Sequence, residues 1–384
     1  MAVIEWKRGT VLQVLEEGEG IQWLAIRREG DTREERAVHY PPLFGRCRPG
    51  DSVWLNTTAV RLGLGTGGVH FVAGLIGRKP EPIPVEGHLM KLRYTPWQVA
   101  VATGEEQGSV WHEQMQRARS LEGTPVLIGE LHSMLPVAAT VWHHLSQGDP
   151  VRAVYVMTDG GALPAPFSRH LRQLKALGWL KGTVTCGHAF GGDLEAVNLY
   201  SGLLLARYAL KADLIFVSMG PGIAGTGTPY GFSGVEQGQA VNAVHSLNGV
   251  GVAIPRIQGK DPRQRHQGLS HHTITNLTSV ALAPAVLPVP RSLPSPVYRQ
   301  LVEVKENSRV NHSWIPVTVT VDEMTDWLEF YPETLRSMGK GIREDPLYYR
   351  TVAGSARVAF ALWEGIRAGR TADEAVARLT RTGV

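Results

Sequence analysis

The sequence predicts an α/β protein with a mainly parallel sheet that carries helices on both faces, preceded by a small N-terminal β-barrel-like domain. Residues 1–77 alternate apolar and polar side chains in short pieces without helical patterns, which is typical of a small barrel or sandwich. From residue 89 to residue 384, apolar runs alternate with helical patterns, which favours parallel strands joined by helices. We expect about five or six strands in this sheet.

A proline-rich stretch, residues 78–88, separates these two parts. It contains RKPEPIPVEG, in which three prolines stand at alternate positions. Such spacing favours an extended polyproline linker. The predicted division is therefore a barrel or sandwich module at 1–77, a linker at 78–88 and an α/β domain at 89–384 that carries the functional site.

Composition and charge narrow the classes of function. The chain has 384 residues, of which 19% are charged, and its formal net charge at pH 7 is +4. Acidic and basic residues are interspersed and form no basic stripe, so no nucleic-acid partner is expected. No segment reaches the about 18 consecutive apolar residues of a membrane span, and the start of the chain lacks the apolar core of a signal peptide. We therefore expect no membrane association, a cytoplasmic location and, with Cys47 and Cys186 far apart in sequence, no disulfide framework.

Five apolar runs mark the expected strands of the α/β domain, at residues 125–128, 151–157, 182–185, 212–217 and 250–255. A helical pattern follows each run. The helix after the second run is expected to end at Gly178. We expect Asp193 to cap a helix over 194–210, and Asp345 to cap a helix with Pro346 at its first position.

Polar and ionisable residues follow these strands at their carboxyl ends. In open parallel sheets, ligands bind beyond the carboxyl ends of the strands. We therefore expect a ligand crevice whose walls are the loops at residues 129–132, 158–161, 186–193, 220–227 and 256–272.

The most glycine-rich of these loops leads to Ser233 and Glu236, which match the S-x-x-E capping box and predict a helix start. The loop also matches G-x-G-x-x-G, but it follows a later strand, and its helix begins about eight residues too late for a dinucleotide-binding fingerprint. The loop backbone is expected either to cradle an anion or carboxylate, or only to turn and pack. The residues assigned to the cradle are Gly220, Gly222, Gly225, Thr226 and Gly227.

Several cationic residues crowd the connection at 256–272. Such a cluster beside a glycine cradle suits a phosphate or carboxylate group, and a solvated loop is the alternative. Because neighbours in the first turn of a helix point in different directions, at most one of His271 and His272 is expected to face the site. The residues assigned to ligand binding are Arg256, Arg263, His266 and His271.

Two residues at strand ends, Asp159 and His188, are the candidates for acid or base chemistry. Gly160 and Gly161 follow Asp159 directly and are expected to contact the ligand. The alternative role of Asp159 is that of a turn or helix cap.

The sequence leaves open whether the protein binds a metal ion or another cofactor. Carboxylate and imidazole groups suited to zinc or manganese stand at the strand ends, but no recognised motif spacing accompanies them. The candidate ligands are Glu130, His132, Asp159, His188 and His271.

Four stretches carry long motifs, VMTDGGALP at 156–164, GHAFGGDLEAVN at 187–198, MGPGIAGTGTPYGFSGVEQG at 219–238 and DPRQRHQGLSHHT at 261–273. Through these motifs the chain resembles an uncharacterised bacterial family, domain-of-unknown-function family 3866. The resemblance covers nearly the whole chain, and motifs of this length are specific. It implies membership of the family and carries no known activity, substrate or catalytic residue.

The expected function is that of an enzyme acting on a small anionic molecule, such as a nucleotide or phosphosugar, by hydrolysis or group transfer at the carboxyl ends of the strands. The alternative is a non-catalytic metabolite-binding or scaffold protein that uses the same loops. A small anionic ligand is the expected partner in both cases, and a homo-oligomer is left open.

Overall fold

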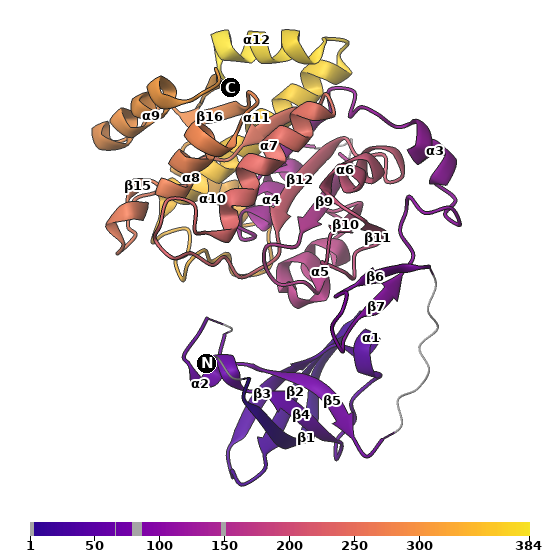
Figure 1. Cartoon of the computed structure of the whole chain (residues 1–384). Helices are drawn as coiled ribbons and strands as arrows, with labels where there is room; N and C mark the ends of the chain where they lie inside the picture. The colour runs from indigo at the N-terminus through magenta and orange to yellow at the C-terminus, as the bar shows by residue number, and fades with distance from the viewer. Residues whose placement is uncertain (1–3, 66, 79–86, 147–150) are drawn as a thin grey trace. The chain divides into compact units, whose positions relative to one another are not determined.

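The computed structural model describes residues 4–65, 67–78, 87–146 and 151–384 (Figure 1). The chain divides into two compact units, residues 1–101 and 102–384, and each is described by itself. Most of the predicted linker at 78–88 lies outside the described residues. A short hairpin, β6 (Leu89–Lys91) and β7 (Val99–Val101), belongs to the first unit.

The N-terminal unit is built on a closed barrel with the strand order β1-β2-β3-β5-β4, which confirms the predicted β-barrel-like domain. Neighbouring strands are antiparallel except β3 and β5, which are parallel. Alternate side chains such as Leu24, Ile26, Val53 and Leu55 fill its interior. The elements are β1 (Trp6–Gly18), β2 (Ile21–Arg28), β3 (Glu34–His39), α1 (Pro41–Phe44), β4 (Ser52–Asn56), α2 (Thr58–Arg61) and β5 (His70–Ile76).

The second unit contains an eight-stranded, all-parallel sheet in the order β11-β10-β9-β12-β8-β13-β16-β17. The parallel sheet is confirmed, whereas the expected five or six strands are too few. β11 is not predicted from the sequence because it is only three residues long. β16 and β17 are not predicted because both contain proline, which is disfavoured inside sheets. The strands are β8 (Pro125–Ile128), β9 (Ala153–Thr158), β10 (Gly182–Cys186), β11 (Leu194–Ala196), β12 (Leu214–Met219), β13 (Val250–Ala253), β16 (Val286–Pro290) and β17 (Ser313–Val317).

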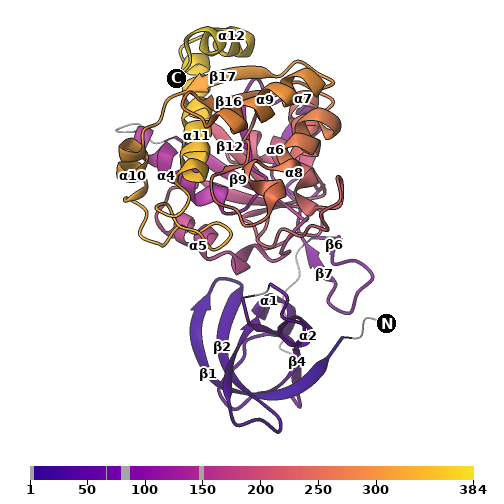
Figure 2. The ribbon, with the colours of Figure 1, turned by 90° about the vertical axis from the view of Figure 1, so that its left-hand side faces the viewer.

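Helices cover both faces of this sheet, as predicted, because side chains alternate between the faces along each strand (Figure 2). Tyr155 and Phe216 pack toward one layer of helices, and Val154 and Val217 pack toward the other. The first layer is α4 (Met134–Leu145), α5 (Arg169–Ala176), α10 (Val321–Leu328), α11 (Pro346–Arg367) and α12 (Ala372–Thr382). The second layer is α3 (His112–Arg117), α6 (Leu199–Tyr208), α7 (Glu236–Ser246), α8 (His271–Thr275) and α9 (Ser295–Asn307).

Several predicted helix boundaries can be compared with the structure. α5 stops before Gly178, and Asp345 caps α11 through the Tyr348 backbone N–H, so both predictions are confirmed. The prediction that Asp193 caps a helix over 194–210 is wrong. β11 occupies the start of that range, and the cap of α6 is Asn198.

The predicted capping box at Ser233 is also wrong. Residues 233–235 form a 3₁₀ turn, η2 (Ser233–Val235), and α7 begins only at Glu236. The Ser233 hydroxyl oxygen accepts a hydrogen bond from the Ala224 backbone N–H, 3.0 Å away, because the glycine-rich loop folds back onto the helix start. Glu236 therefore does not form a capping box with Ser233.

At the centre of the sheet, the helices that follow two neighbouring strands lie on opposite faces. β8 leads into α4 on one face, and β12 leads into α7 on the other. Loops that leave adjacent parallel strands toward opposite faces open a crevice at their carboxyl ends. In open parallel sheets, such a point is where ligands commonly bind.

Each unit contains one buried cysteine, and neither cysteine forms a disulfide. Cys47 is 2% exposed in the barrel, and Cys186 is 3% exposed at the end of β10. Burial raises the pKa of the Cys47 thiol to about 12. No helix in the described part of the chain is long and apolar enough to cross a membrane.

Candidate functional site

Ionisable residues of the second unit gather where β8, β12 and β13 end. The start of α7 is fastened over these ends by Gln237, whose side-chain amide donates to the carbonyl oxygens of Ile128 at 3.0 Å and Ile254 at 2.9 Å. Ile128 is the last residue of β8 and Ile254 follows β13 directly, so one side chain ties two strands to one helix. The position of the loops around them is therefore fixed by buried hydrogen bonds.

Glu130 and Arg256 form a buried ion pair at the centre of this region. Nη1 of Arg256 lies 2.9 Å from Oε1 of Glu130, and neither side chain is more than 1% exposed. Within the described residues, Oε2 of Glu130 and Nη2 of Arg256 have no hydrogen-bond partner, although Oδ2 of Asp261 lies 4.0 Å from Nη2. Burial acts to raise the pKa of Glu130, but the charge of Arg256 and the contact with His272 hold that pKa below its ordinary value.

His272 is held between Glu130 and Phe232. Its Nδ1 lies 2.7 Å from Oε1 of Glu130, and its ring stacks on Phe232 with 3.8 Å between the ring centroids. Because an ionised carboxylate only accepts, Nδ1 carries a hydrogen and donates it to Glu130. Nε2 faces Gly225, where an added Cβ would lie 3.6 Å from it.

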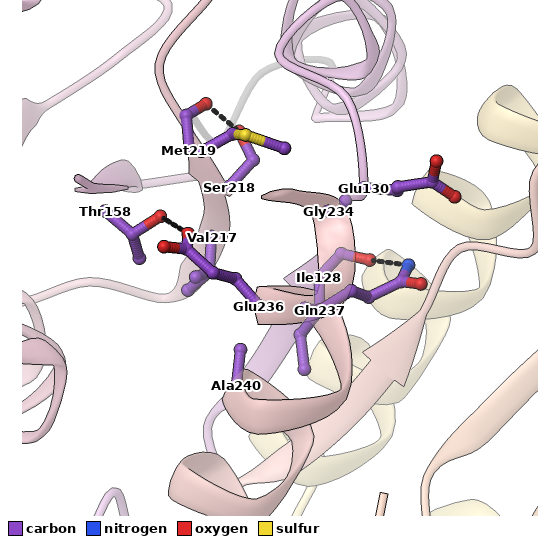
Figure 3. A pocket seen from close by; sticks show the side chains of 11 residues that line it. Ile128, Glu130, Thr158, Val217, Ser218, Met219, Gly234, Glu236, Gln237 and Ala240 are labelled. Atoms are coloured by element: carbon purple, nitrogen blue, oxygen red, sulfur yellow. Dashed lines mark hydrogen bonds between the residues drawn. The ribbon is translucent and has the colours of Figure 1, made fainter. Parts of the chain in front are cut away.

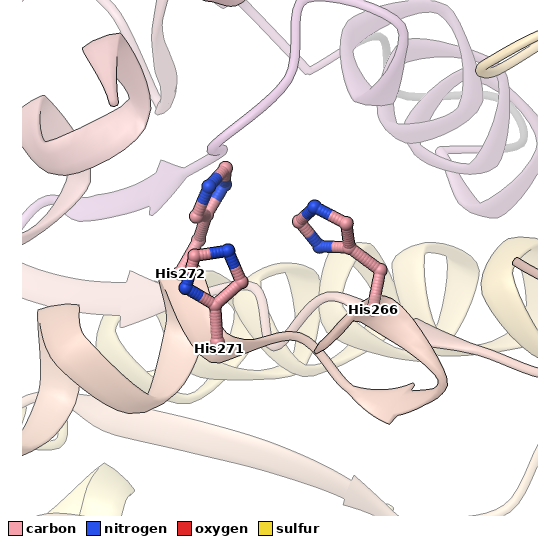
Figure 4. Close-up of side chains that lie close together, drawn as sticks. All are labelled: His266, His271 and His272. Atoms are coloured by element: carbon pink, nitrogen blue, oxygen red, sulfur yellow. The ribbon is translucent and has the colours of Figure 1, made fainter. Parts of the chain in front are cut away.

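Three histidines form a compact group beside this ion pair (Figure 4). His266, His271 and His272 each offer one nitrogen, and these nitrogens all lie within 4.8 Å of one another. Burial, followed by the nearby arginines, lowers the pKa of His266 to about 3, and burial, followed by His272, lowers the pKa of His271 to about 4. Both of these rings are therefore neutral near pH 7, in the form that binds metal ions.

His271 and His272 both face this group, so the expectation that at most one of them would do so is wrong. They are the first two residues of α8, behind the N-cap Ser270, and their ring centroids are 4.3 Å apart. No helical turn precedes the start of a helix, so rotamers that a preceding turn would block are open there. Two adjacent side chains can therefore converge.

A small cavity of about 10 Å³ lies beneath the strand ends, and Thr158, Gly234 and Glu236 are among the residues that line it (Figure 3). This volume is about what one water molecule needs. The Thr158 hydroxyl donates to Oε2 of Glu236, and the carboxylates of Glu236 and Glu130 point away from each other. Burial raises the pKa of Glu236, the Thr158 hydrogen bond offsets part of this rise, and nearby Asp159 adds to it.

The glycine-rich loop folds into a short hairpin over the strand ends. Gly225 bridges Phe232, and the Thr226 backbone N–H donates to the Gly231 carbonyl oxygen at 2.7 Å. Gly222 and Gly227 have φ angles of +104° and +81°, which favour glycine. The hairpin thus uses the Thr226 N–H that an anion cradle would offer, and the predicted cradle remains a prediction.

Gly160, Gly161 and Gly220 lie where the loops after β9 and β12 touch. A Cβ at Gly161 would overlap the carbonyl oxygen of Gly220, and a Cβ at Gly160 would lie 2.6 Å from Cδ of Glu236. These glycines therefore permit a close approach of backbone to backbone and of backbone to Glu236. The ligand contacts predicted for them remain untested.

The predicted acid–base residues lie next to each other. Oδ2 of Asp159 accepts a hydrogen bond from the His188 backbone N–H at 2.8 Å, which ties the loop after β9 to the loop after β10. Neither residue belongs to the three-histidine group. Their catalytic roles stay predictions, and the structure gives Asp159 a clear part in holding the loops.

The five predicted metal ligands do not come together within the described residues. Only His271 belongs to the three-histidine group, and Glu130 contacts that group through His272. His132 is buried elsewhere, with Nε2 at 2.6 Å from the Ser168 hydroxyl and Nδ1 at 3.1 Å from the Tyr155 hydroxyl.

Arg263 lies at the edge of the site. Its guanidinium makes two hydrogen bonds of 3.0 Å with the carboxylate of Asp261, and its side chain is 37% exposed. Asp261 neutralises much of the charge of Arg263. The Arg263 side chain is partly exposed, and Arg265 is exposed. The loop thus presents cations at its surface and buries Arg256 beneath them.

Three residues of the site escaped the sequence reasoning: His272, Glu236 and Gln237. The rule on neighbouring helical residues allows only one of His271 and His272 to face the site, and the S-x-x-E pattern predicts a capping role for Glu236. The neighbouring residues Val235 and Gly238 give no sign that Gln237 is buried and Glu236 half-buried. A charged residue at the first turn of a helix that follows a strand end is the one signal that points to Glu236.

The fold and the site together define a two-unit α/β protein whose ionisable residues gather at the carboxyl ends of a parallel sheet. The chain belongs to the family described as Protein of unknown function (DUF3866), whose model matches residues 36–356. This match runs from β3 of the barrel into α11 and so includes every residue of the site. No curated protein matches the chain.

Proposed function

We propose that this protein is an enzyme that acts on a small anionic molecule by hydrolysis or group transfer at the carboxyl ends of β8, β12 and β13. The observation that supports it most is the buried Glu130–Arg256 pair, in which one oxygen and one nitrogen lack a hydrogen-bond partner among the described residues. Buried ion pairs contribute little to stability, and unsatisfied buried groups need another explanation. A site that a ligand completes supplies that explanation.

Acid–base chemistry is assigned to Glu236. Its raised pKa keeps a proton on the carboxyl group to higher pH than usual, whereas the lowered pKa of Glu130 keeps that carboxylate ionised. Two carboxyl groups with pKa values shifted apart are typical of a division between an acid and an ionised partner. The cavity beside Glu236 has room for about one water molecule, which a hydrolytic reaction consumes.

Nucleotides and sugar phosphates are the proposed substrates. Arg263 and Arg265 are arginines at the surface of the loop that buries Arg256, and guanidinium groups suit phosphate oxygens. We also place the enzyme in the cytoplasm, where reducing conditions keep thiols such as Cys47 and Cys186 out of disulfides.

The test is a screen of the full-length protein against nucleoside phosphates and sugar phosphates, with products measured by mass spectrometry. We expect turnover of one substrate class, and we expect Glu236→Gln to lower kcat by about 10²–10⁴-fold, the usual size of an acid–base contribution. Glu303→Gln, at an exposed position of α9, is the matched control and should leave kcat unchanged.

An absence of turnover in this screen would favour the alternative function, that of a metabolite-binding or scaffold protein. In that case native mass spectrometry of the purified protein would show a retained small molecule that persists unchanged during long incubation. No member of the screen would be converted, and the enzyme proposal would be abandoned.

A further inference from the structure

The three-histidine group contains the ingredients of a metal centre. His266 ends a 3₁₀ turn, η3 (Gln264–His266), and His271 and His272 begin α8. Their three ligand nitrogens lie within 4.8 Å of one another, and His266 faces the other two rings from the neighbouring turn (Figure 4). Zinc–nitrogen bonds of 2.0–2.1 Å place tetrahedral ligands about 3.3 Å apart, so an ion would draw the rings together by small side-chain rotations.

We propose that His266, His271 and His272 bind a divalent transition-metal ion, with zinc as the ion best suited to the site. Three imidazole nitrogens favour zinc and related metals over magnesium and calcium, which prefer oxygen ligands. Three protein ligands leave a further position on the ion open to water or substrate, which is the arrangement of catalytic zinc sites. The inference adds a metal cofactor to the chain but does not depend on the proposed function, because metal binding can be measured without any substrate.

Hydrogen bonds to the outer ring nitrogens prepare two of the three rings. Nδ1 of His272 is bonded to Oε1 of Glu130 at 2.7 Å, and Nδ1 of His266 lies 2.8 Å from the hydroxyl of Ser270. Contacts of this kind fix the orientation of a ring and leave its Nε2 for the metal. Metal-binding histidines commonly have such partners, and a carboxylate is the strongest of them.

The third ring supplies an independent observation. Nε2 of His271 is buried and has no hydrogen-bond partner within the described residues. A buried ring nitrogen without a partner is unfavourable unless something else binds it. The ring centroids of His266 and His271 are 4.9 Å apart, which keeps the two rings within reach of one ion.

Glu130 is assigned an outer role and is not a ligand in this proposal. Its Oε1 contacts Nδ1 of His272, on the side of the ring away from Nε2. A carboxylate in that place orients the ring and makes Nε2 of His272 more basic, and so a better ligand for a metal ion. Glu130 is therefore a positioning residue whose loss should weaken the site without abolishing it.

The experiment uses the full-length protein after chelation and dialysis, with zinc and cobalt(II) ions as the probes. Isothermal titration with Zn²⁺ should give one bound ion per chain, and Co²⁺ should give the strong visible absorption of a four-coordinate site. Glu130→Gln should weaken Zn²⁺ binding by about 10–100-fold, as expected for an outer partner. His271→Gln should weaken it further, and His245→Gln, at an exposed position of α7, should leave it unchanged.

Circular dichroism confirms that each variant is folded before titration. His271 is the preferred ligand variant because its side chain is only half-buried, whereas His266 and His272 are buried. The proposal is overturned if folded wild-type protein binds neither ion stoichiometrically, or if His271→Gln and His266→Gln both bind Zn²⁺ as the wild type does. A protein that binds zinc tightly but converts no substrate would retain this site and lose the proposed function.

Discussion

The carboxylate of Glu130 bonds the ring of His272 across 142 residues of sequence, with 2.7 Å between Oε1 and Nδ1. The same oxygen also accepts from Arg256, so one atom connects the loop after β8, the loop after β13 and the first turn of α8. Three segments that carry the proposed chemistry are therefore linked through a single carboxylate.

Removing that carboxylate should destabilise the protein strongly. Glu130→Leu leaves the Arg256 charge buried without its partner, and breaking a buried pair in this way costs about 3–5 kcal/mol of unfolding free energy. Urea denaturation measures the loss. The control is Glu113→Ala, which removes an exposed pair with Arg117 and should cost at most about 1 kcal/mol.

The double variant Glu130→Leu/Arg256→Met should recover much of that loss, because an apolar pair of similar size replaces both charges. A double variant no more stable than Glu130→Leu would contradict the assignment of the loss to an uncompensated charge. The same double variant should lose the proposed activity, since it removes the charged centre of the site.

The contact between the loops after β9 and β12 predicts the effect of a single methyl group. Gly161→Ala places a Cβ against the Gly220 carbonyl oxygen, and relief requires a backbone shift that should cost about 1–3 kcal/mol. Gly108→Ala is the matched control, because no atom lies within 4 Å of its added Cβ and its φ is not positive. Thermal denaturation of the two variants side by side would count against this account if Gly161→Ala were as stable as Gly108→Ala.

Stability should fall as the pH drops below about 6.5. Burial, followed by His170, lowers the pKa of His132 to about 3, and burial lowers the pKa of His312 despite its hydrogen bond to the Leu277 carbonyl oxygen. The unfolded chain takes up protons on these rings near pH 6.5 while the folded chain does not, so the stability they contribute is present above that pH and is lost below it. Each ring that stays neutral contributes a slope of up to about 1.4 kcal/mol per pH unit.

Urea denaturation at a series of pH values between 7.5 and 5 measures this slope, in a chelating buffer that removes any bound metal ion. His312→Gln should reduce the slope, whatever its effect on stability at pH 7.5. A free energy of unfolding that is flat or rises toward pH 5 would contradict the prediction.

The roles of Asp159 and His188 are separated by conservative substitutions. Asp159→Asn keeps an oxygen that can accept from the His188 backbone N–H, so the loops should hold while the negative charge is lost. If Asp159 and His188 take part in catalysis, Asp159→Asn and His188→Gln should each abolish turnover while the circular dichroism spectrum is unchanged. Unchanged kcat in both variants would leave Asp159 with its structural hydrogen bond alone and end the catalytic assignment.

The fold could be predicted from the sequence because its signals are local. Apolar runs such as 125–128 and 212–217 are long enough to identify β8 and β12, and the alternation in the first 77 residues indicates a small barrel or sandwich. β16 and β17 escaped because their prolines resemble loop residues, and their places in the sheet depend on α9 and α11 packing over them.

The site was only partly predictable, because its key contacts join distant segments. His266 and His271 were recognised as loop cations, but the group they form with His272 depends on how η3 and α8 meet. Glu236 was misassigned because a capping box looks the same in sequence whether its serine caps the helix or binds the loop before it. Only the tertiary fold decides between the two.

Each unit of the chain carries its own built-in reporter of unfolding. A thiol reagent modifies a cysteine only when the side chain becomes exposed, and Cys47 and Cys186 are buried in different units. The order in which the two thiols react as urea rises therefore gives the order in which barrel and sheet open, without an introduced label. Simultaneous reaction would mean that the two units unfold as one cooperative body.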